Sequence, residues 1–237
     1  MLIIKKVQGL QMLAKKLRIK LTCLILRFLH IFISGKTVRI YGFKLEICKN
    51  VFSPLCTFSS KLLIKSALEE VEKQDIMLDL GTGSGIISLV LANKASYTVA
   101  SDISEYAARC ALKNMKMNNL DLLCDVVICD LTCAFRRGAF SLIVFNPPYI
   151  KGKAKNDLEK AWFDDCNLIE NFLEKAYRIL RENGRIIIAY SDIGPLKHFL
   201  AFSRNTGWHV KTIAFKKFLG ETIYVFRLNW KNSFYCQ

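Results

Sequence analysis

The sequence predicts an α/β fold: a doubly wound, mostly parallel seven-stranded sheet with an antiparallel final strand, plus an N-terminal helical extension. Two observations predict the sheet. Short apolar runs alternate with helical patterns from Ile76 onward, which is typical of parallel strands joined by crossover helices. The last two strands, Trp208–Phe215 and Thr222–Leu228, are separated by a turn at Leu219-Gly220 and no helix, so they form a hairpin. With 237 residues, 52% of them hydrophobic, the chain can bury a sizeable core.

Each remaining element has a local signal. Gly42 lies within Val38–Ile47 and predicts a short hairpin or extended stretch there. Ser59 or Ser60 is expected to cap a helix that runs to about Val71, after a loop marked by Pro54. The other expected strands are residues 76–80, 97–101, 125–129, 141–145 and 185–190, and the other expected helices are residues 84–94, 104–117, 167–182 and 195–204.

Residues 1–35 are expected to form a basic amphipathic extension, and residues 36–237 the main domain. The net charge is +15, yet residues 1–45 hold ten basic residues and no acidic one. Apolar residues recur at steps of three and four from Ile3 to Ile31, which predicts a helix. Such a helix can pack on the protein's own core, lie on a membrane surface, or dock on RNA or a partner. The best apolar window, Leu21–Ser34, is too short for a transmembrane span.

The nine cysteines do not form a recognisable metal motif, because no C-x-x-C is present. Their number is odd, and several, such as Cys110, fall inside apolar runs where a thiol behaves as a small hydrophobe. The cysteine pattern therefore predicts no metal and a reduced, intracellular protein.

The strongest local motif is a glycine-rich loop, Asp79-Leu80-Gly81-Thr82-Gly83-Ser84-Gly85, at the end of a strand. Glycines at alternate positions let the backbone turn sharply and approach a ligand closely. Ile86 stands where a dinucleotide fingerprint needs a small residue, and no G-K-[ST] phosphate loop is present. Asp79 would repel a pyrophosphate but suits a positive amine. The predicted ligand contacts in the loop are Asp79, Gly81, Thr82, Gly83 and Gly85.

Further carboxylates follow the next two strands. Asp102, with Ile103 after it, is placed to accept hydrogen bonds from a ribose. Asp130 can accept from an adenine amino group while Leu131 packs on the ring. The carboxyl ends of parallel strands share one edge of the sheet, so these residues are expected to converge. The predicted ligand has an amine, a ribose and an adenine but no phosphate, and S-adenosylmethionine fits this description.

The fourth strand is followed by Asn146-Pro147-Pro148-Tyr149, and these four residues are the predicted catalytic group. Each proline fixes φ, so the flanking side chains keep a set geometry. The side-chain carbonyl of Asn146, which is also expected to line the cofactor site, and the main-chain carbonyl of Pro147 can accept from a planar NH2 group. The ring of Tyr149 can lie against a flat amide or base. Acceptors that favour a pyramidal, positively charged nitrogen stabilise the transition state more than the ground state.

Together, the D-x-G-x-G-x-G loop, Asp102, Asp130 and N-P-P-Y resemble the class I, Rossmann-like S-adenosylmethionine-dependent methyltransferases that modify planar amino groups. Within this N-P-P-Y group the chain is most similar to the HemK-related protein-glutamine N5-methyltransferases, which act on the Gly-Gly-Gln motif of peptide release factors. The V-F-S-P stretch at residues 51–54 and the G-E-T-I stretch at residues 220–223 carry this resemblance. The chain departs from the family pattern at Cys56-Thr57 and at Asp164-Asp165.

The resemblance implies a cytoplasmic N-methyltransferase that acts on a release factor, with a small zinc-binding activator protein as a further partner. One alternative is an N6-adenine or N2-guanine methyltransferase of RNA or DNA, in which Tyr149 stacks on a flipped base and the basic extension contacts phosphates. A second alternative is an inactive nucleic-acid-binding protein of the same fold. The C-terminal match favours glutamine, because it is more particular than net charge.

Overall fold

The computed structural model describes Leu24, Ile25, Phe28 and residues 30–51, 53, 57–155, 157–164, 167–218 and 220–231. The chain divides into two compact units, Met1–Ser34 and Gly35–Gln237. The helix expected from Ile3 to Ile31 lies almost entirely outside the described residues. None of the helices among the described residues is long and apolar enough to cross a membrane.

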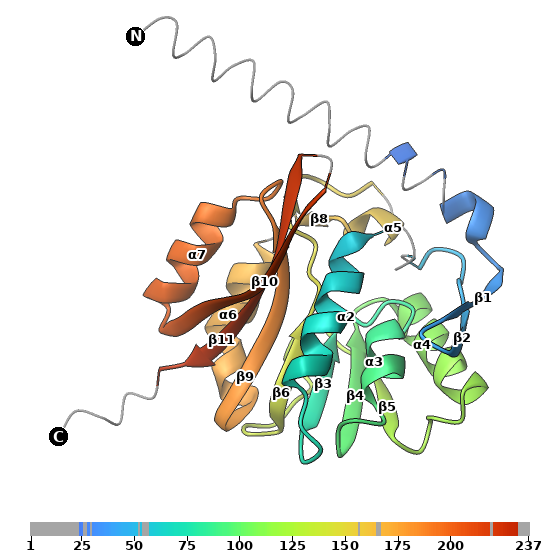
Figure 1. Cartoon of the computed structure of the whole chain (residues 1–237), viewed down its shortest axis with the longest axis horizontal. Helices are drawn as coiled ribbons and strands as arrows, with labels where there is room; N and C mark the ends of the chain where they lie inside the picture. The colour runs from blue at the N-terminus through green and yellow to red at the C-terminus, as the bar shows by residue number, and fades with distance from the viewer. Residues whose placement is uncertain are drawn as a thin grey trace, which may run out of the picture. The chain divides into compact units, whose positions relative to one another are not determined.

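The second unit is built on one seven-stranded sheet, in the order β10-β11-β9-β6-β3-β4-β5 (Figure 1). Strand β11 runs opposite to the other six strands of this sheet, because it pairs antiparallel with both β10 and β9 while the other pairs in the sheet are parallel. The predicted sheet, with its antiparallel final strand, is confirmed. The strands are β3 (Ile76–Leu80), β4 (Tyr97–Asp102), β5 (Cys124–Ile128), β6 (Phe140–Phe145), β9 (Leu180–Ser191), β10 (Trp208–Phe218) and β11 (Glu221–Trp230).

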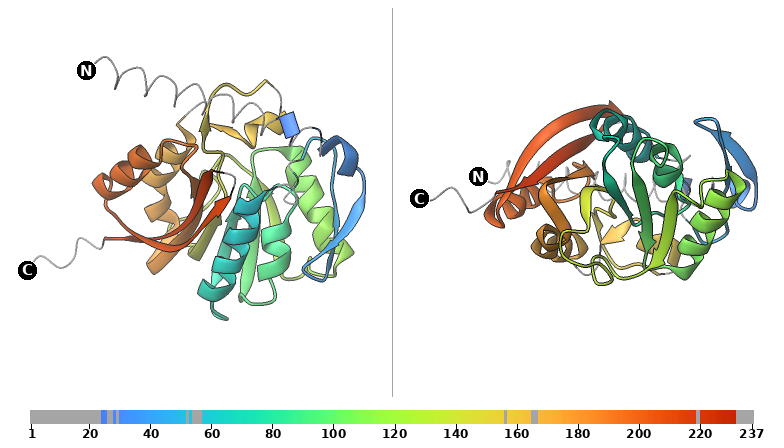
Figure 2. Two further views of the ribbon diagram at one scale, coloured as in Figure 1. Left: turned by 45° about the horizontal axis from the view of Figure 1, so that its top comes forward. Right: turned by 90° about the horizontal axis from the view of Figure 1, so that it is seen from below.

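Helices cover both faces of this sheet. Figure 1 shows α2 and α3 in front of the sheet and α6 behind it, and the views in Figure 2 show the same layers. Side chains such as Leu78, Ile143 and Phe172 fill the main core and are fully buried. The helices are α2 (Phe58–Glu70), α3 (Ile86–Leu91), α4 (Glu105–Met117), α6 (Leu168–Ile179) and α7 (Leu196–Asn205), and the smaller elements are β1 (Thr37–Ile40), β2 (Phe43–Glu46), β7 (Ile150–Lys151), α5 (Asp157–Lys160) and β8 (Phe163–Asp164).

Three sequence-based boundaries are wrong. The helix expected over residues 167–182 ends at Ile179, because the main chain of Arg178 already bonds to Gly138 and Leu180 pairs with β6. The helix expected over residues 84–94 is only α3, because Gly85 (φ 84°) still belongs to the preceding loop. Neither Ser59 nor Ser60 caps α2, whose N-cap is Thr57 without a side-chain cap bond.

A buried ion pair joins three central strands of the sheet, on the side away from the carboxyl ends of β3 and β6. Arg185 on β9 donates to both carboxylate oxygens of Asp75, with N–O distances of 3.1 and 2.7 Å, and Ser141 on β6 donates to the same carboxylate at 2.6 Å. Burial alone would raise the pKa of Asp75, but the hydrogen bonds from Arg185, Ser141 and the Glu72 main chain bring it below its ordinary value. Because each partner satisfies the other, the pair ties the residue before β3 to the start of β6 and to the middle of β9.

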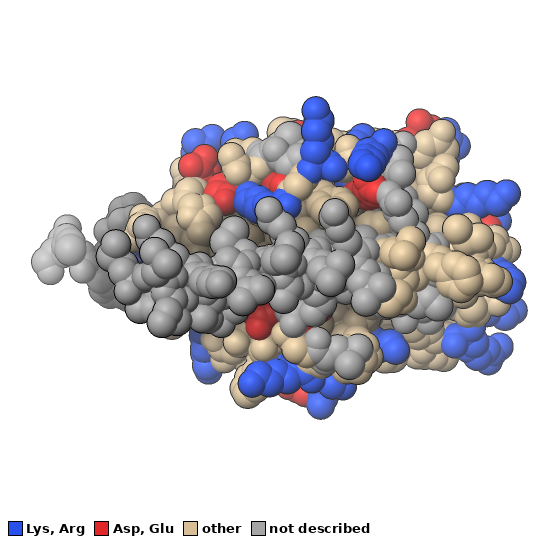
Figure 3. All heavy atoms as spheres, turned by 90° about the horizontal axis from the view of Figure 1, so that it is seen from above, with Lys and Arg blue, Asp and Glu red and all other residues tan. Residues whose placement is uncertain are grey.

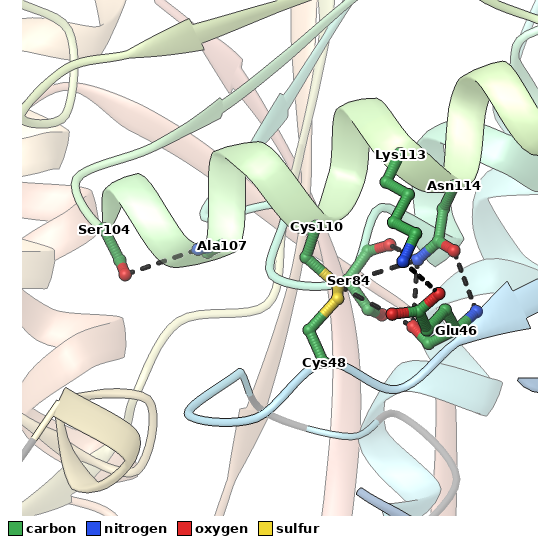
Figure 4. Close-up of a disulfide and its surroundings, with 8 residues drawn as sticks. All are labelled: Glu46, Cys48, Ser84, Ser104, Ala107, Cys110, Lys113 and Asn114. Atoms are coloured by element: carbon green, nitrogen blue, oxygen red, sulfur yellow. Dashed lines mark hydrogen bonds and ion pairs between the residues drawn. A yellow bond between two sulfur atoms is a disulfide. The ribbon is translucent and has the colours of Figure 1, made fainter. Parts of the chain in front are cut away.

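The β1–β2 hairpin is attached to α4 by a disulfide and by an asparagine (Figure 4). Cys48 and Cys110 are disulfide-bonded, with their Cα atoms 6.0 Å apart, so the expectation that these cysteines are reduced is wrong. Residue spacing could not reveal this pairing, because 62 positions separate the two cysteines. Asn114 on α4 accepts from the main-chain N–H of Glu46 at 2.8 Å and donates to the carbonyl of Glu46 at 3.0 Å. The hairpin is therefore held against α4 by covalent and polar contacts.

Candidate active site

The glycine-rich loop, Asp102 and Asn146 meet at one edge of the sheet. The strands that precede them, β3, β4 and β6, are parallel neighbours, and Leu80 at the end of β3 pairs with both Ser101 and Phe145. The main-chain N–H of Thr82 donates to the carbonyl of Ser101 at 2.9 Å, which ties the loop to β4. The sequence-based expectation that these motifs converge agrees with this arrangement.

Left-handed backbone shapes the loop. Gly81, Gly83 and Gly85 have φ values of 65°, 56° and 84°, a region that only glycine adopts without strain. At Gly85 a Cβ would also lie 3.0 to 3.1 Å from atoms of Met115 and Ala111 on α4. Gly85 therefore allows α3 to begin in contact with α4, and the loop ahead of it stays open to a ligand.

Asp79 is fully buried beneath the loop and orders it. One carboxylate oxygen accepts from the Thr82 hydroxyl at 2.6 Å and from the Ser88 hydroxyl and main-chain N–H at 2.7 and 3.1 Å. The other oxygen has no hydrogen-bond partner among the described residues. Burial raises the pKa of Asp79 to about 6, although the Thr82 and Ser88 bonds oppose this shift. An unpaired buried carboxylate oxygen is costly unless a donor reaches it, and a ligand's amine would be such a donor.

Asp102 stands at the end of β4 and also supports the loop. Its two oxygens accept from the main-chain N–H groups of Gly83 and Ser104, at 3.0 and 2.9 Å. Burial raises the pKa of Asp102, while these backbone bonds lower it. Each oxygen has a second lone pair, so the carboxylate can still accept from a hydroxyl.

The next strand places Asp130 and Leu131 beside this group. The main-chain N–H of Cys129 donates to the carbonyl of Asp102 at 3.0 Å, so the end of β5 lies against the end of β4. Asp130 is exposed, as is Ile103, whose side chain is 64% accessible. Leu131 has a φ of 48° and packs against the main core. These residues lie at the same edge as the loop, where the sequence predicts an adenine site.

Two serines of α2 fix the amide of Asn146. Its nitrogen donates to the hydroxyl of Ser60 at 3.0 Å and to that of Ser59 at 3.5 Å, and both serines are buried. The amide oxygen is also buried and has no hydrogen-bond partner among the described residues. With the nitrogen already engaged, Asn146 presents a carbonyl acceptor. The sequence does not predict this role of the serines, because an adjacent serine pair at the start of a helix is typical of a cap.

Tyr149 follows the two prolines and is half-buried. Its ring centroid lies 5.7 Å from that of Tyr190. Burial, followed by the negative charge of Glu221, raises the pKa of Tyr149, so its phenol remains protonated in the physiological range. Pro147 is buried and Pro148 is half-buried. The four N-P-P-Y residues thus form a rigid, largely enclosed segment at the end of β6.

These groups fit S-adenosylmethionine. One oxygen of Asp79 and the amide oxygen of Asn146, which lack hydrogen-bond partners among the described residues, are buried acceptors at one edge of the sheet. Asp102 retains acceptor capacity beside them. The glycines leave the loop free of side chains where a ligand approaches. Asp79 would hold the amine, Asp102 the ribose, and Asp130 with Leu131 the adenine.

Known proteins resemble this chain in sequence. The methyltransferase small domain family matches residues 44–204. A protein from Methanocaldococcus jannaschii, named as a protein N5-glutamine methyltransferase, is 28% identical over 187 residues, which are 75% of this chain and 90% of that protein. The release factor glutamine methyltransferase of Streptomyces coelicolor is 29% identical over 185 residues, which are 70% of this chain and 64% of the relative.

Other similar proteins have different names. The tRNA1(Val) (adenine(37)-N6)-methyltransferase of Proteus mirabilis is 27% identical over 158 residues, covering 62% of each chain. Among solved structures, the E. cuniculi Mtq2–Trm112 complex responsible for methylation of the eRF1 translation termination factor has a similar fold, with a TM-score of 0.56 and 20% identity over 77% of this chain and 99% of that chain. The chain belongs to the methyltransferase small domain family and is an S-adenosylmethionine-dependent methyltransferase with the class I, Rossmann-like fold.

Proposed function

We propose that the protein methylates the side-chain amide nitrogen of a glutamine in a peptide release factor. The observation that carries methyl transfer to a planar NH2 group is the buried carbonyl oxygen of Asn146, which has no hydrogen-bond partner among the described residues and is held in place by Ser60 and Ser59. A planar amide nitrogen is a poor nucleophile, and it needs acceptors for its protons more than it needs a base. The names of the archaeal and Streptomyces coelicolor relatives support glutamine as the acceptor.

Asn146 would act in the transfer step by accepting a hydrogen bond from the acceptor's NH2 group. When bound, S-adenosylmethionine supplies a methyl group activated by its sulfonium. The acceptor nitrogen forms the new N–C bond as the S–C bond breaks, and the proton that it then loses passes to water. The bond to Asn146 strengthens as the nitrogen becomes positive, so it lowers the barrier more than it tightens binding. Pro147 and Pro148 would hold this geometry.

An RNA or DNA base amine is the second candidate acceptor. The same carbonyl oxygen of Asn146 accepts from an exocyclic amine as readily as from a carboxamide, and the net charge of +15 suits a polyanion. Glutamine is preferred because the relatives that span most of this chain have that name.

The location and partners follow from the same proposal. A release-factor methyltransferase would work in the cytoplasm with its substrate. A small activator protein is a proposed partner, since the similar Mtq2 structure is a complex with Trm112. Residues 1–35 would serve as a basic extension that contacts RNA, a partner or a membrane surface, and residues 36–237 would carry the activity.

Labelled methyl transfer tests the acceptor directly. The full chain is incubated with labelled S-adenosylmethionine and, separately, a release factor, total RNA and DNA, with and without a small activator protein. We expect label on the release factor and loss of that label when its Gly-Gly-Gln glutamine is changed to Asn. An Asn146→Ala enzyme is the matched negative control. Label on RNA or DNA alone would replace glutamine with a base amine as the acceptor.

A further inference from the structure

The edge strand β10 and the first turns of α2 form a surface rich in lysine and phenylalanine. Among the described residues, β10 pairs with β11 alone, and no strand lies along its other edge. Its last residues, Phe215-Lys216-Lys217-Phe218, are all exposed. On α2, Lys61 and Lys65 are exposed one turn apart. We call the surface made by Phe58, Lys61, Lys65, Lys216 and Phe218 the lysine–phenylalanine surface.

Ring and cation contacts join the two elements. The ring centroids of Phe58 on α2 and Phe218 on β10 lie 3.9 Å apart. The ammonium groups of Lys216 and Lys61 lie 5.5 and 5.8 Å from the centroid of Phe58. Phe218 is still 39% accessible, so part of its ring is free to stack on a flat partner. The lysines and the rings therefore belong to one surface.

The charge of this surface is predominantly positive. Strand β10 carries Lys211, Lys216 and Lys217 and no carboxylate, and the first carboxylate of α2 is Glu69, near the end of that helix. Within the part of the chain that the structure describes, these three lysines, Lys61 and Lys65 form no ion pair with a carboxylate. Figure 3 shows Lys and Arg side chains prominent along both margins of the molecule seen from above.

The surface adjoins the candidate active site through α2. Phe58 is followed directly by Ser59 and Ser60, which hold the amide of Asn146. A polymer lying on the outer side of this turn would therefore pass beside the N-P-P-Y segment.

We propose that the lysine–phenylalanine surface binds single-stranded nucleic acid, with phosphates at the lysines and a base on the exposed ring of Phe218. Aromatic rings interleaved with cations are the usual means by which proteins bind single strands without reading their sequence. An acidic peptide would use the lysines but not the rings. This contact goes beyond the proposed methylation of a release factor, because it does not depend on which group accepts the methyl.

An alternative role of the same lysines is to prevent self-association, and the experiment must distinguish this role from nucleic-acid binding. Lysines on a free edge strand hinder pairing with a second copy of the chain. In that case their replacement would change oligomeric state and leave nucleic-acid binding intact. Size-exclusion chromatography of every variant therefore accompanies the binding measurements.

Fluorescence anisotropy with labelled twelve-nucleotide oligo(U) and oligo(dT) tests the proposal on the full chain. The variant is Lys61→Glu/Lys65→Glu/Lys216→Glu, and Lys73→Glu/Lys94→Glu/Lys116→Glu, with three exposed lysines outside the surface, is the charge-matched control. We expect the triple variant of the surface to have a Kd at least about tenfold larger than that of the control. The slope of its log binding constant against log salt concentration should be reduced by about 2, since each phosphate contact on a single strand contributes about 0.7. Phe218→Ala should raise the Kd about fivefold or more through lost stacking, with the salt slope unchanged.

Three results would overturn the proposal: no binding by the wild type, equal losses in the variant and its charge-matched control, or binding of polyglutamate as tight as that of oligo(U). Unchanged circular dichroism and cofactor binding establish that each variant is folded. Release-factor methylation is measured on the same variants. A chain that methylates the release factor but does not bind oligonucleotides refutes this surface alone, whereas the reverse result refutes the proposed acceptor alone.

Discussion

Ser60→Ala tests whether the amide of Asn146 must be held in place for catalysis. The substitution removes a buried hydrogen bond of 3.0 Å and leaves only the longer 3.5 Å bond from Ser59. Such a bond contributes about 1 kcal/mol net. Because 1.36 kcal/mol corresponds to a tenfold change in rate, kcat should fall about fivefold. Ser59→Ala/Ser60→Ala, which frees the amide to rotate, should lower kcat by about tenfold or more but by less than the roughly hundredfold loss expected for Asn146→Ala.

Steady-state methyl transfer at saturating cofactor is the assay, with cofactor affinity measured by calorimetry. Ser66→Ala is the matched control, because Ser66 is equally buried on α2 but forms no bond to Asn146. The KM for the cofactor should stay constant, since the serines do not support the glycine-rich loop. In an Asn146→Ala background the serine changes should have no further effect on kcat. An unchanged kcat in the double serine variant, or an equal loss without Asn146, would refute the positioning role.

Three further predictions concern the cofactor loop and the disulfide. Asp102→Ala should raise the calorimetric Kd for S-adenosylmethionine about tenfold or more and change kcat at saturation less than about threefold, and unaltered affinity would contradict the ribose assignment. The pKa of Asp79 is raised by burial from 3.8 to about 6, so its stabilising contribution is present below pH 4 and is lost as the pH rises through 6. In urea unfolding of the cofactor-free protein, Asp79→Asn should therefore gain about 2 kcal/mol relative to wild type between pH 4 and pH 7, and a constant difference would contradict a raised pKa. Cys48→Ser should lower the free energy of unfolding by about 2–4 kcal/mol under oxidising conditions and by much less with dithiothreitol, given the 62-residue separation from Cys110.

The sequence predicts the arrangement of strands well because each signal is local. Gly83 and Gly85 identify the loop, and Asn146 marks the end of β6. Since parallel strands end at a common edge, the order of strands along the chain is enough to predict that these groups lie close together. The antiparallel direction of β11 is also predicted from local order, because no helix separates this strand from β10.

Contacts between distant segments could not be predicted in this way. Ser60 and Asn146 are 86 positions apart, and no periodicity links a helix's first turn to a strand's end. Asn114 looks like an ordinary polar residue on α4, yet it is fully buried and bonds to β2. The end of α6 was misplaced because Leu180 favours a helix by propensity, while its pairing with Phe140 is a tertiary effect.

Asn114 couples the motion of the β1–β2 hairpin to that of the glycine-rich loop. Its amide nitrogen donates both to the carbonyl of Glu46 and to that of Ser84 in the glycine-rich loop, at 3.0 and 2.9 Å. One side chain thus satisfies the backbone of two segments that are remote in sequence, so a displacement of Asn114 breaks its bonds to both. We therefore expect amide protons of the β1–β2 hairpin and of the loop to exchange with solvent at a common rate, as one cooperative opening unit.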